Sequence, residues 1–142
     1  MKLVLDASVA ASWLLKRIDP REIAIADRAI EAVQRQGAKV PSIWPTEVAN
    51  TLLTAERRGI STSAASTKFL ADLATLDVTF ESIDLIAMQR STINLARSHQ
   101  LTAYGATYLE LALRTGSSLA TFDRQLASAF RNLGGHVFGD LP

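Results

Sequence analysis

The chain has 142 residues, of which 48% are hydrophobic and 20% charged, and its formal net charge is +1. This length and balance predict one domain over residues 1–142, and the small net charge argues against a strong binder of polyanions. Cysteine is absent, which excludes disulfides, thiolate metal sites and cysteine catalysis. No apolar run is long enough to span a membrane, and Asp6 interrupts the N-terminal apolar stretch, so we expect a cytoplasmic protein without a membrane partner.

Short apolar runs alternate with helical periodicities along the first half of the chain. Lys2 to Asp6 reads as a buried strand, and Pro20 and Gly37 stand where a helix begins and ends. The elements expected here are strands over 2–6 and 39–40 and helices over 7–15, 20–36 and 44–58.

The same alternation continues through the second half of the chain. Ser61 or Ser63 can cap the next helix, and Thr102 can cap a later one that ends at Gly116. Further elements are strands at 78–80, 118–122 and 136–138 and helices over 83–98, 103–114 and 124–133. In the helix over 83–98 we expect Ile86, Ile93 and Leu95 to face inward. This order predicts an α/β domain around a small, mostly parallel sheet with helices on both faces.

Two of the apolar runs end in an aspartate, the first at Asp6 and the second at Asp123. The carboxyl ends of the strands in an open parallel sheet meet at one edge, and ligands bind there. Two carboxylates at that edge repel each other unless a cation lies between them, so the pair predicts a divalent-metal site. Each aspartate could instead cap the helix that follows it, and the sequence leaves both roles open.

Glu47 lies in the first turn of the helix expected over 44–58, where the helix dipole favours an acidic side chain on the surface. Its neighbours Trp44 and Val48 are apolar, so its carboxylate is expected along a partly buried edge. Asn50 follows on the same side of the helix and could hydrogen-bond Glu47 or a substrate. Magnesium and manganese prefer hard oxygen ligands, and acidic residues from separate elements suit such a site.

The remaining polar residues carry weaker signals. His99 and His136 are far apart and lack metal-ligand spacing, so both are interpreted as surface or structural residues. Most arginines are interpreted as parts of solvated helix faces. Lys16–Arg17 and Arg57–Arg58 are the best candidates for a phosphate-binding rim, because arginine suits bidentate contact with phosphate.

Four motifs follow one another along the chain. They are Val4-Leu5-Asp6-Ala7-Ser8-Val9, Pro45-Thr46-Glu47-Val48-Ala49-Asn50, Leu101-Thr102-Ala103-Tyr104 through Tyr108-Leu109-Glu110-Leu111-Ala112, and Leu119-Ala120-Thr121-Phe122-Asp123. In this order the chain resembles the PIN-domain ribonucleases, specifically the VapC-type toxins of bacterial toxin–antitoxin pairs. The resemblance covers essentially the whole chain.

The resemblance implies a PIN-like fold, a small parallel β-sheet sandwiched between α-helices, and an acidic cluster that binds Mg²⁺ or Mn²⁺ and hydrolyses RNA. It also implies a homodimer and a cognate antitoxin whose tail covers the site. Carried over by motif, the catalytic and metal-binding residues are Asp6, Glu47 and Asp123, and the supporting polar residues are Ser8, Asn50 and Thr121.

The third motif departs from the family pattern, which has an aspartate after the tyrosine where this chain has Gly105. Glycine inside a helix costs about 1 kcal/mol relative to alanine, and this position after Thr102 favours an acid that completes a capping box. Glu110 faces elsewhere on the helix and does not replace the missing acid. Gly105 fits either an engineered inactivation or natural drift, and it predicts weakened metal binding and turnover with RNA and antitoxin binding retained.

The function predicted from the sequence is therefore that of a metal-dependent endoribonuclease toxin impaired at Gly105. The alternative is a catalytically inactive PIN module that binds a cognate antitoxin or RNA without cleavage. A metal-dependent phosphatase or DNA nuclease is disfavoured, because Ala7–Ser8 follow Asp6 where a phosphatase would have a second aspartate. The apolar helices around Leu52–Leu53 and 69–73 also favour a dimer.

Overall fold

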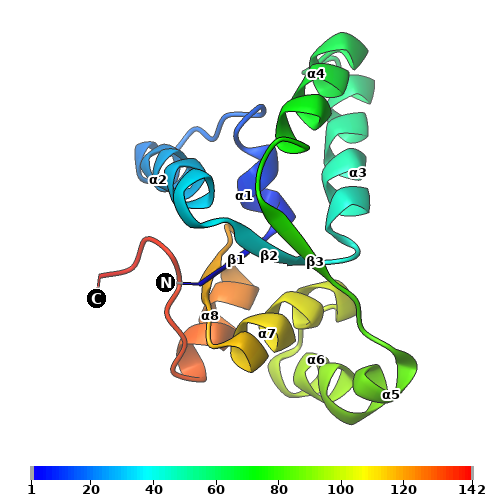
Figure 1. Cartoon of the computed structure of the whole chain (residues 1–142), viewed down its shortest axis with the longest axis vertical. Helices are drawn as coiled ribbons and strands as arrows, with labels where there is room; N and C mark the ends of the chain where they lie inside the picture. Colours follow the sequence, from blue (N-terminus) through cyan, green and yellow to red (C-terminus); the bar gives the residue numbers. More distant parts are fainter. Residues whose placement is uncertain (1, 142) are drawn as a thin grey trace.

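The computed structural model describes residues 2–141 and is built around one parallel sheet (Figure 1). Its four strands lie in the order β3-β2-β1-β4, and every neighbouring pair is parallel. The strands are β1 (Leu3–Leu5), β2 (Ala38–Pro41), β3 (Val78–Glu81) and β4 (Ser118–Ala120). The predicted small parallel sheet is confirmed.

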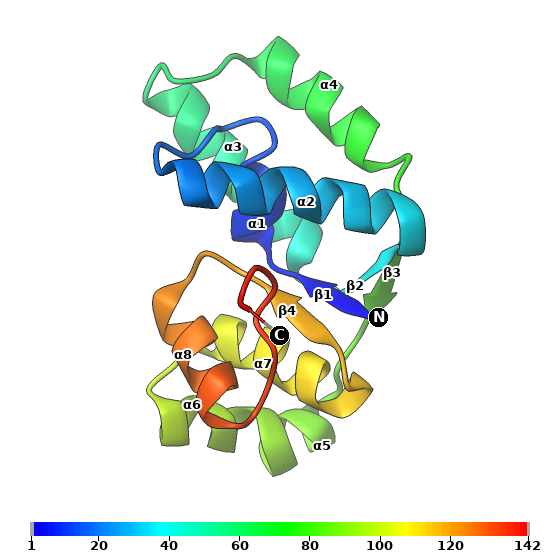
Figure 2. The same ribbon diagram turned by 90° about the vertical axis from the view of Figure 1, so that its left-hand side faces the viewer.

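Helices cover both faces of this sheet (Figure 2). On one face lie α1 (Ala7–Ala11), α2 (Pro20–Gln36), α3 (Trp44–Arg57) and α4 (Ser63–Leu73), and on the other α5 (Leu85–Ala87), α6 (Ile93–His99), α7 (Ala103–Thr115) and α8 (Arg124–Asn132). A π-helical turn, η1 (Met88–Thr92), joins α5 to α6. No helix within residues 2–141 is both long and apolar enough to cross a membrane.

The core lies where the two helical layers meet the sheet. Every residue of β1 and β4 is buried, as expected for strands covered on both faces, which need continuous rather than alternating apolar sequence. From one layer α3 contributes Leu52, and from the other α7 contributes Tyr108 and Leu109. The central strands are therefore held on both sides, and the residues that follow them have little freedom of position.

The strand predicted over 136–138 is wrong, because this segment makes only a single parallel bridge, between Val137 and Leu119. The Leu119 N–H donates to the His136 carbonyl at 3.2 Å and the Leu119 carbonyl accepts from Phe138 N–H at 2.9 Å. Gly139 then adopts φ 100°, and the Asp140 N–H turns back to the Val137 carbonyl. The chain thus leaves the sheet after one paired residue.

The helix predicted over 83–98 is interrupted by η1, and this interruption rotates its two halves relative to each other. A π-helical turn inserts an extra residue into the helical repeat, so a stripe that faces inward on one side of it no longer does so on the other. Ile93 and Leu95 are half-buried as expected, whereas Ile86 is 60% exposed and was wrongly predicted to face inward.

Several predicted helix ends are confirmed, whereas three differ, one of them the helix predicted from residue 83, which begins at Leu85 after the cap Asp84. Asp19 and Pro20 start α2, Gly37 ends it, and Thr102 caps α7. The cap of α4 is Thr62, whose side chain accepts from the Ala65 N–H, rather than Ser61 or Ser63. Helix α1 stops at Ala11 instead of residue 15, because the chain turns there and the Trp13 indole N–H donates to the Ala26 carbonyl of α2 at 3.0 Å.

Candidate active site

Strand order and register bring Asp6 and Thr121 together at the carboxyl edge of the sheet. β1 pairs with β2 on one side and with β4 on the other, so the direction of strand order reverses between β1 and β4, which is where ligands bind in open α/β sheets. Leu5 is in register with Ala120, and the next residues on the two strands therefore emerge side by side. The Thr121 hydroxyl donates to Asp6 Oδ2 at 2.7 Å.

Asp6 is the centre of a hydrogen-bond network that joins the two strand ends. The Ser8 hydroxyl donates to the same Asp6 oxygen, Oδ2, at 2.6 Å. Each hydroxyl also accepts a main-chain N–H, Ser8 Oγ from Phe122 at 3.0 Å and Thr121 Oγ1 from Asp123 at 3.0 Å. Ser8 and Thr121 therefore both contact Asp6, and the supporting role that the resemblance implies for them stays a prediction.

The environment of Asp6 is that of a buried acid rather than of a helix cap. Only 8% of Asp6 is exposed, and although it stands at the N-cap position of α1, its side chain makes no capping hydrogen bond. Burial raises the pKa of Asp6 above its ordinary value, the hydrogen bonds from Ser8 and Thr121 oppose this shift, and the negative charge of Asp123 adds to it. The capping role left open for Asp6 is thus not used.

Asp123, in contrast, does cap the helix that follows it. Its Oδ1 accepts from the main-chain N–H groups of Gln125 and Leu126 at 3.0 and 3.1 Å, at the start of α8. The side chain is exposed, and it lies close enough to Asp6 for its charge to raise the pKa of Asp6. Capping uses one carboxylate oxygen and leaves Oδ2 without a recorded side-chain partner in the described part of the chain.

Glu47 reaches the same edge from α3 and is held by a tyrosine of α7. The Tyr108 hydroxyl donates to Glu47 Oε1 at 2.7 Å. Burial raises the pKa of Glu47, the hydrogen bond from Tyr108 lowers it, and the charge of Asp6 raises it further. Asn50 is exposed, and no hydrogen bond between it and Glu47 is recorded within residues 2–141.

Tyr108 is the functional residue that reasoning from the sequence missed. It is 1% exposed and belongs to the apolar stripe of α7, where its spacing is that of a core residue. Burial, the charge of Asp6 and the hydrogen bond to Glu47 all raise the pKa of Tyr108, so its hydroxyl keeps the proton that it donates. The available signal was its chemistry, because a buried tyrosine hydroxyl almost always has a hydrogen-bond partner.

Gly105 occupies the third position of α7, one helical turn before Tyr108. Its main-chain N–H donates to the Thr102 hydroxyl at 3.0 Å, as expected for the residue that a threonine cap satisfies. A Cβ added at Gly105 would lie 3.5 Å from Thr102 Oγ1 and 3.9 Å from Leu101 Cβ, which is ordinary van der Waals contact. The fold therefore does not require glycine here, because a Cβ fits without a clash.

The three predicted acids lie close enough to influence one another, but they do not form a ready-made cage. Within residues 2–141 no three acidic or histidine side chains are grouped closely enough to hold a metal ion between them. Each carboxylate nevertheless has one oxygen fixed by a hydrogen bond, namely Asp6 Oδ2, Glu47 Oε1 and Asp123 Oδ1. The other oxygen of each has no side-chain partner among the described residues, although the Asp6 carboxylate also accepts the Ala7 main-chain N–H. Carboxylates oriented in this way are the hard oxygen donors that suit Mg²⁺ or Mn²⁺.

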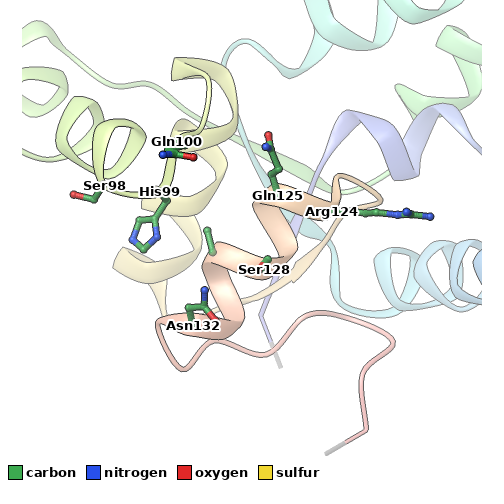
Figure 3. A pocket seen from close by; sticks show the side chains of 8 residues that line it. Ser98, His99, Gln100, Arg124, Gln125, Ser128 and Asn132 are labelled. Carbon is green, nitrogen blue, oxygen red and sulfur yellow. The ribbon is translucent and has the colours of Figure 1, made fainter.

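A separate hollow of about 390 Å³ lies between the end of α6 and α8 (Figure 3). Its lining is polar and includes Ser98, His99, Ser128 and Asn132. None of the predicted acids lines it, and Arg124 points away from the other labelled side chains in this view. We therefore place the candidate site at the acidic edge of the sheet.

No family model matches the chain. A curated relative, Ribonuclease VapC3 from Pyrobaculum aerophilum, is 32% identical over 130 residues, which cover 92% of this chain and 95% of the relative. Among solved structures, PAE2754 from Pyrobaculum aerophilum matches with a TM-score of 0.68 and 22% identity, over 91% of this chain and 79% of that one. A toxin–antitoxin complex from Klebsiella pneumoniae matches with a TM-score of 0.63 and 15% identity, over 100% of both chains. The structural likeness confirms the predicted PIN-like α/β fold.

Proposed function

This chain belongs to the family of VapC ribonucleases, and on that premise we propose that it is the toxin of a type II toxin–antitoxin pair and an endoribonuclease. The observation that carries the proposal is Asp6, a buried carboxylate at the point where the strand order reverses, flanked by two further acids. Such an edge binds ligands in open α/β sheets. The single PIN domain of residues 1–142, the RNA substrate and the cytoplasmic location are parts of the same proposal.

The proposed cofactor is Mg²⁺ or Mn²⁺, bound by Asp6, Glu47 and Asp123, whose carboxylates would have to move toward a shared ion because they are not grouped around one point in this structure. Burial raises the pKa of both Asp6 and Glu47, and each feels the charge of a neighbouring acid, so a divalent cation would relieve the cost of keeping these carboxylates ionised. A bound divalent ion supplies charge that lowers the pKa of water and stabilises negative charge on phosphate oxygens.

The surrounding residues fix the acids in place. Ser8 and Thr121 donate to one oxygen of Asp6, and Tyr108 donates to one oxygen of Glu47. Hydrogen bonds of this kind fix the direction in which the remaining oxygen points, and such outer partners commonly determine metal affinity. Asn50, exposed on α3, is proposed to contact substrate rather than Glu47.

Gly105 is proposed to impair this site. It lies one turn before Tyr108 on α7, and a Cβ at this position would make only ordinary van der Waals contacts. An aspartate here would add a carboxylate at the beginning of α7, where the helix dipole favours negative charge. Without it, metal affinity and turnover are expected to be low.

The alternative is a PIN module that binds a cognate antitoxin or RNA without cleaving it. The capping role of Asp123 favours this alternative, because one oxygen of that carboxylate is already used by α8. The acidic edge would then attract a basic side chain of an antitoxin. Either function is compatible with the antitoxin partner that we propose.

The deciding experiment is Mn²⁺ titration calorimetry on the wild-type chain, Gly105→Asp and Gly105→Ala, with RNA cleavage measured in parallel. We expect Gly105→Asp to bind Mn²⁺ more tightly and to cleave faster than both others, and a chelator to abolish cleavage. Gly105→Ala controls for helix propensity, because alanine is favoured over glycine by about 1 kcal/mol without adding a ligand.

Two outcomes contradict the proposal. Cleavage that survives the chelator would exclude the metal mechanism. If neither the wild-type chain nor Gly105→Asp binds Mn²⁺ or cleaves RNA, the binding-module alternative holds instead.

A further inference from the structure

An arginine from the connection between α1 and α2 lies beside the acidic edge. The guanidinium carbon of Arg17 lies 4.8 Å from the ring centroid of Phe122. Phe122 stands between Thr121 and Asp123, and its main-chain N–H donates to Ser8 Oγ at 3.0 Å. The residue under the guanidinium is thus part of the network around Asp6, which fixes the position of the positive charge relative to the acids.

The same guanidinium is held from the other side by a carboxylate of α2. Arg17 Nη2 donates to Glu22 Oε2 at 3.0 Å, and Nε lies 3.4 Å from Oε1. The two side chains remain 39% and 28% exposed, and an ion pair this accessible contributes little to stability. Its two-point geometry is, however, that with which arginine binds a phosphate group.

A hollow opens next to this pair. It has a volume of about 380 Å³, and Glu22, Phe122 and Asp123 line it together with Arg124. Arg17 does not line this hollow itself, but both groups that it contacts, Glu22 and the Phe122 ring, do. A single strand with one phosphate at the acidic edge and the next nucleotide in the hollow would therefore run beside the Arg17–Glu22 pair. The other candidate rim, Arg57–Arg58, lies at the far end of α3, about 15 Å along the helix axis from Glu47.

We propose that Arg17 binds a phosphate group of single-stranded RNA next to the scissile one, and that Glu22 holds the guanidinium in position until the RNA phosphate replaces it. This inference rests on the proposed function, since it names how the same site holds its substrate. It follows that the two halves of the ion pair have opposite effects: losing Arg17 weakens RNA binding, whereas losing Glu22 strengthens it.

The test measures binding of a short, fluorescein-labelled single-stranded RNA of mixed sequence by fluorescence anisotropy, with EDTA present so that metal and cleavage do not contribute. The variants are Arg17→Gln and Glu22→Gln. The controls are Arg114→Gln and Glu110→Gln, which break an ion pair of 2.7 Å on α7 with the same changes of charge; its arginine is 49% exposed and its glutamate 13%. Thermal unfolding of each variant verifies that it is folded.

We expect Arg17→Gln to bind the RNA about three- to tenfold more weakly at low salt and to have a slope of log affinity against log salt that is shallower by about 0.7, the value for one phosphate contact on a single strand. Glu22→Gln should bind more tightly than wild type, and by more than Glu110→Gln, which reports the effect of net charge alone.

Equal losses in Arg17→Gln and Arg114→Gln would overturn the inference and leave the proposed nuclease intact. Weaker RNA binding by Glu22→Gln would also overturn it, because the ion pair would then serve only to hold the connection before α2. If the wild-type chain does not bind this RNA in EDTA, the inference is wrong, whereas the proposed function is still decided by the Mn²⁺ titration and the cleavage assay.

Discussion

Burying the Asp6 carboxylate at the candidate site lowers the folding stability of the protein at neutral pH. The fold buries this carboxylate beside Asp123, and only two hydroxyl donors and a main-chain N–H offset the loss of water. Its pKa is raised, so the folded chain retains the proton at a pH where the unfolded chain has released it. Folding stability therefore falls as the pH rises from the ordinary range of an aspartate toward the raised pKa, and the full penalty remains at higher pH.

Asp6→Asn is accordingly expected to stabilise the protein at neutral pH, by about 1 kcal/mol, while abolishing metal binding. The difference from wild type should shrink as the pH falls below the ordinary pKa of aspartate, because Asp6 is then protonated in both states. Urea unfolding at acidic and neutral pH measures this, with the exposed Asp27→Asn as control. A wild-type chain more stable than Asp6→Asn at neutral pH would contradict the prediction.

Tyr108→Phe tests the support of Glu47. The hydrogen bond from Tyr108 lowers the pKa of Glu47 against the effect of burial, so its loss should raise that pKa, and it should cost about 1 kcal/mol of stability. An NMR titration of the Glu47 side-chain carboxyl carbon follows the shift. Tyr104→Phe, in the same helix but 61% exposed, is the control and should leave the pKa of Glu47 unchanged. If Tyr108→Phe also leaves the pKa of Glu47 unchanged, the hydrogen bond from Tyr108 does not control that pKa.

Single site residues could be predicted from the sequence where they follow neighbouring strands of the sheet. Asp6 and Asp123 could be predicted together because strand ends in a parallel sheet meet at one edge, whereas Ser8 and Thr121 came only from the family resemblance. Tyr108 could not, since its partner is 61 residues away and its position in an apolar stripe is that of any core residue. Long-range pairing between two helices leaves no local pattern.

Among the elements, α8 connects stability to the candidate site. Its N-terminal N–H groups are satisfied by Asp123, the same residue that is proposed to hold the metal. Asp123 therefore caps α8 and is also proposed to bind the metal. A substitution that removes both functions at once cannot tell which of them caused an effect.

The pair Asp123→Asn and Asp123→Ala separates these roles. Asparagine caps helices about as well as aspartate, so Asp123→Asn should retain stability within about 0.5 kcal/mol but lose Mn²⁺ affinity. Asp123→Ala should lose the affinity and, in addition, about 1 kcal/mol of stability with the cap. Chemical denaturation and calorimetry on both variants provide the comparison. Full Mn²⁺ affinity in Asp123→Asn would mean that Asp123 is only a cap.

The elements themselves followed from the sequence wherever a local signal marks a boundary. Glycines after helices and the threonine before α7 gave correct ends. The π-helical turn at 88–92 was not predictable, because the helical periodicity of the sequence does not reveal one inserted residue. The segment 136–138 failed as a strand for a geometric reason, since Gly139 turns it away from β4.

At the scale of the whole molecule, the α3–α4 hairpin carries apolar side chains that the core does not cover. Leu52, Phe69 and Leu73, which suggested an excess of apolar surface, are accounted for by the core. Two other leucines of the hairpin, Leu53 and Leu70, are 43% and 41% exposed, and Ile60 between the helices is 68% exposed. The proposed homodimer would use this surface.

Sedimentation velocity on the wild-type chain should therefore show a dimer, and the double variant Leu53→Lys/Leu70→Lys should shift it to monomer. Burying a leucine contributes about 1.5–3 kcal/mol, and each substitution acts on both protomers of a symmetric dimer. The dissociation constant of the dimer should therefore rise by at least about tenfold. Leu113→Lys, at an equally exposed leucine of α7, is the matched control and should leave the dimer intact. A monomeric wild-type chain would exclude the homodimer, and a dimer disrupted by Leu113→Lys alone would move the interface to the opposite layer of helices, where α7 packs beside α6.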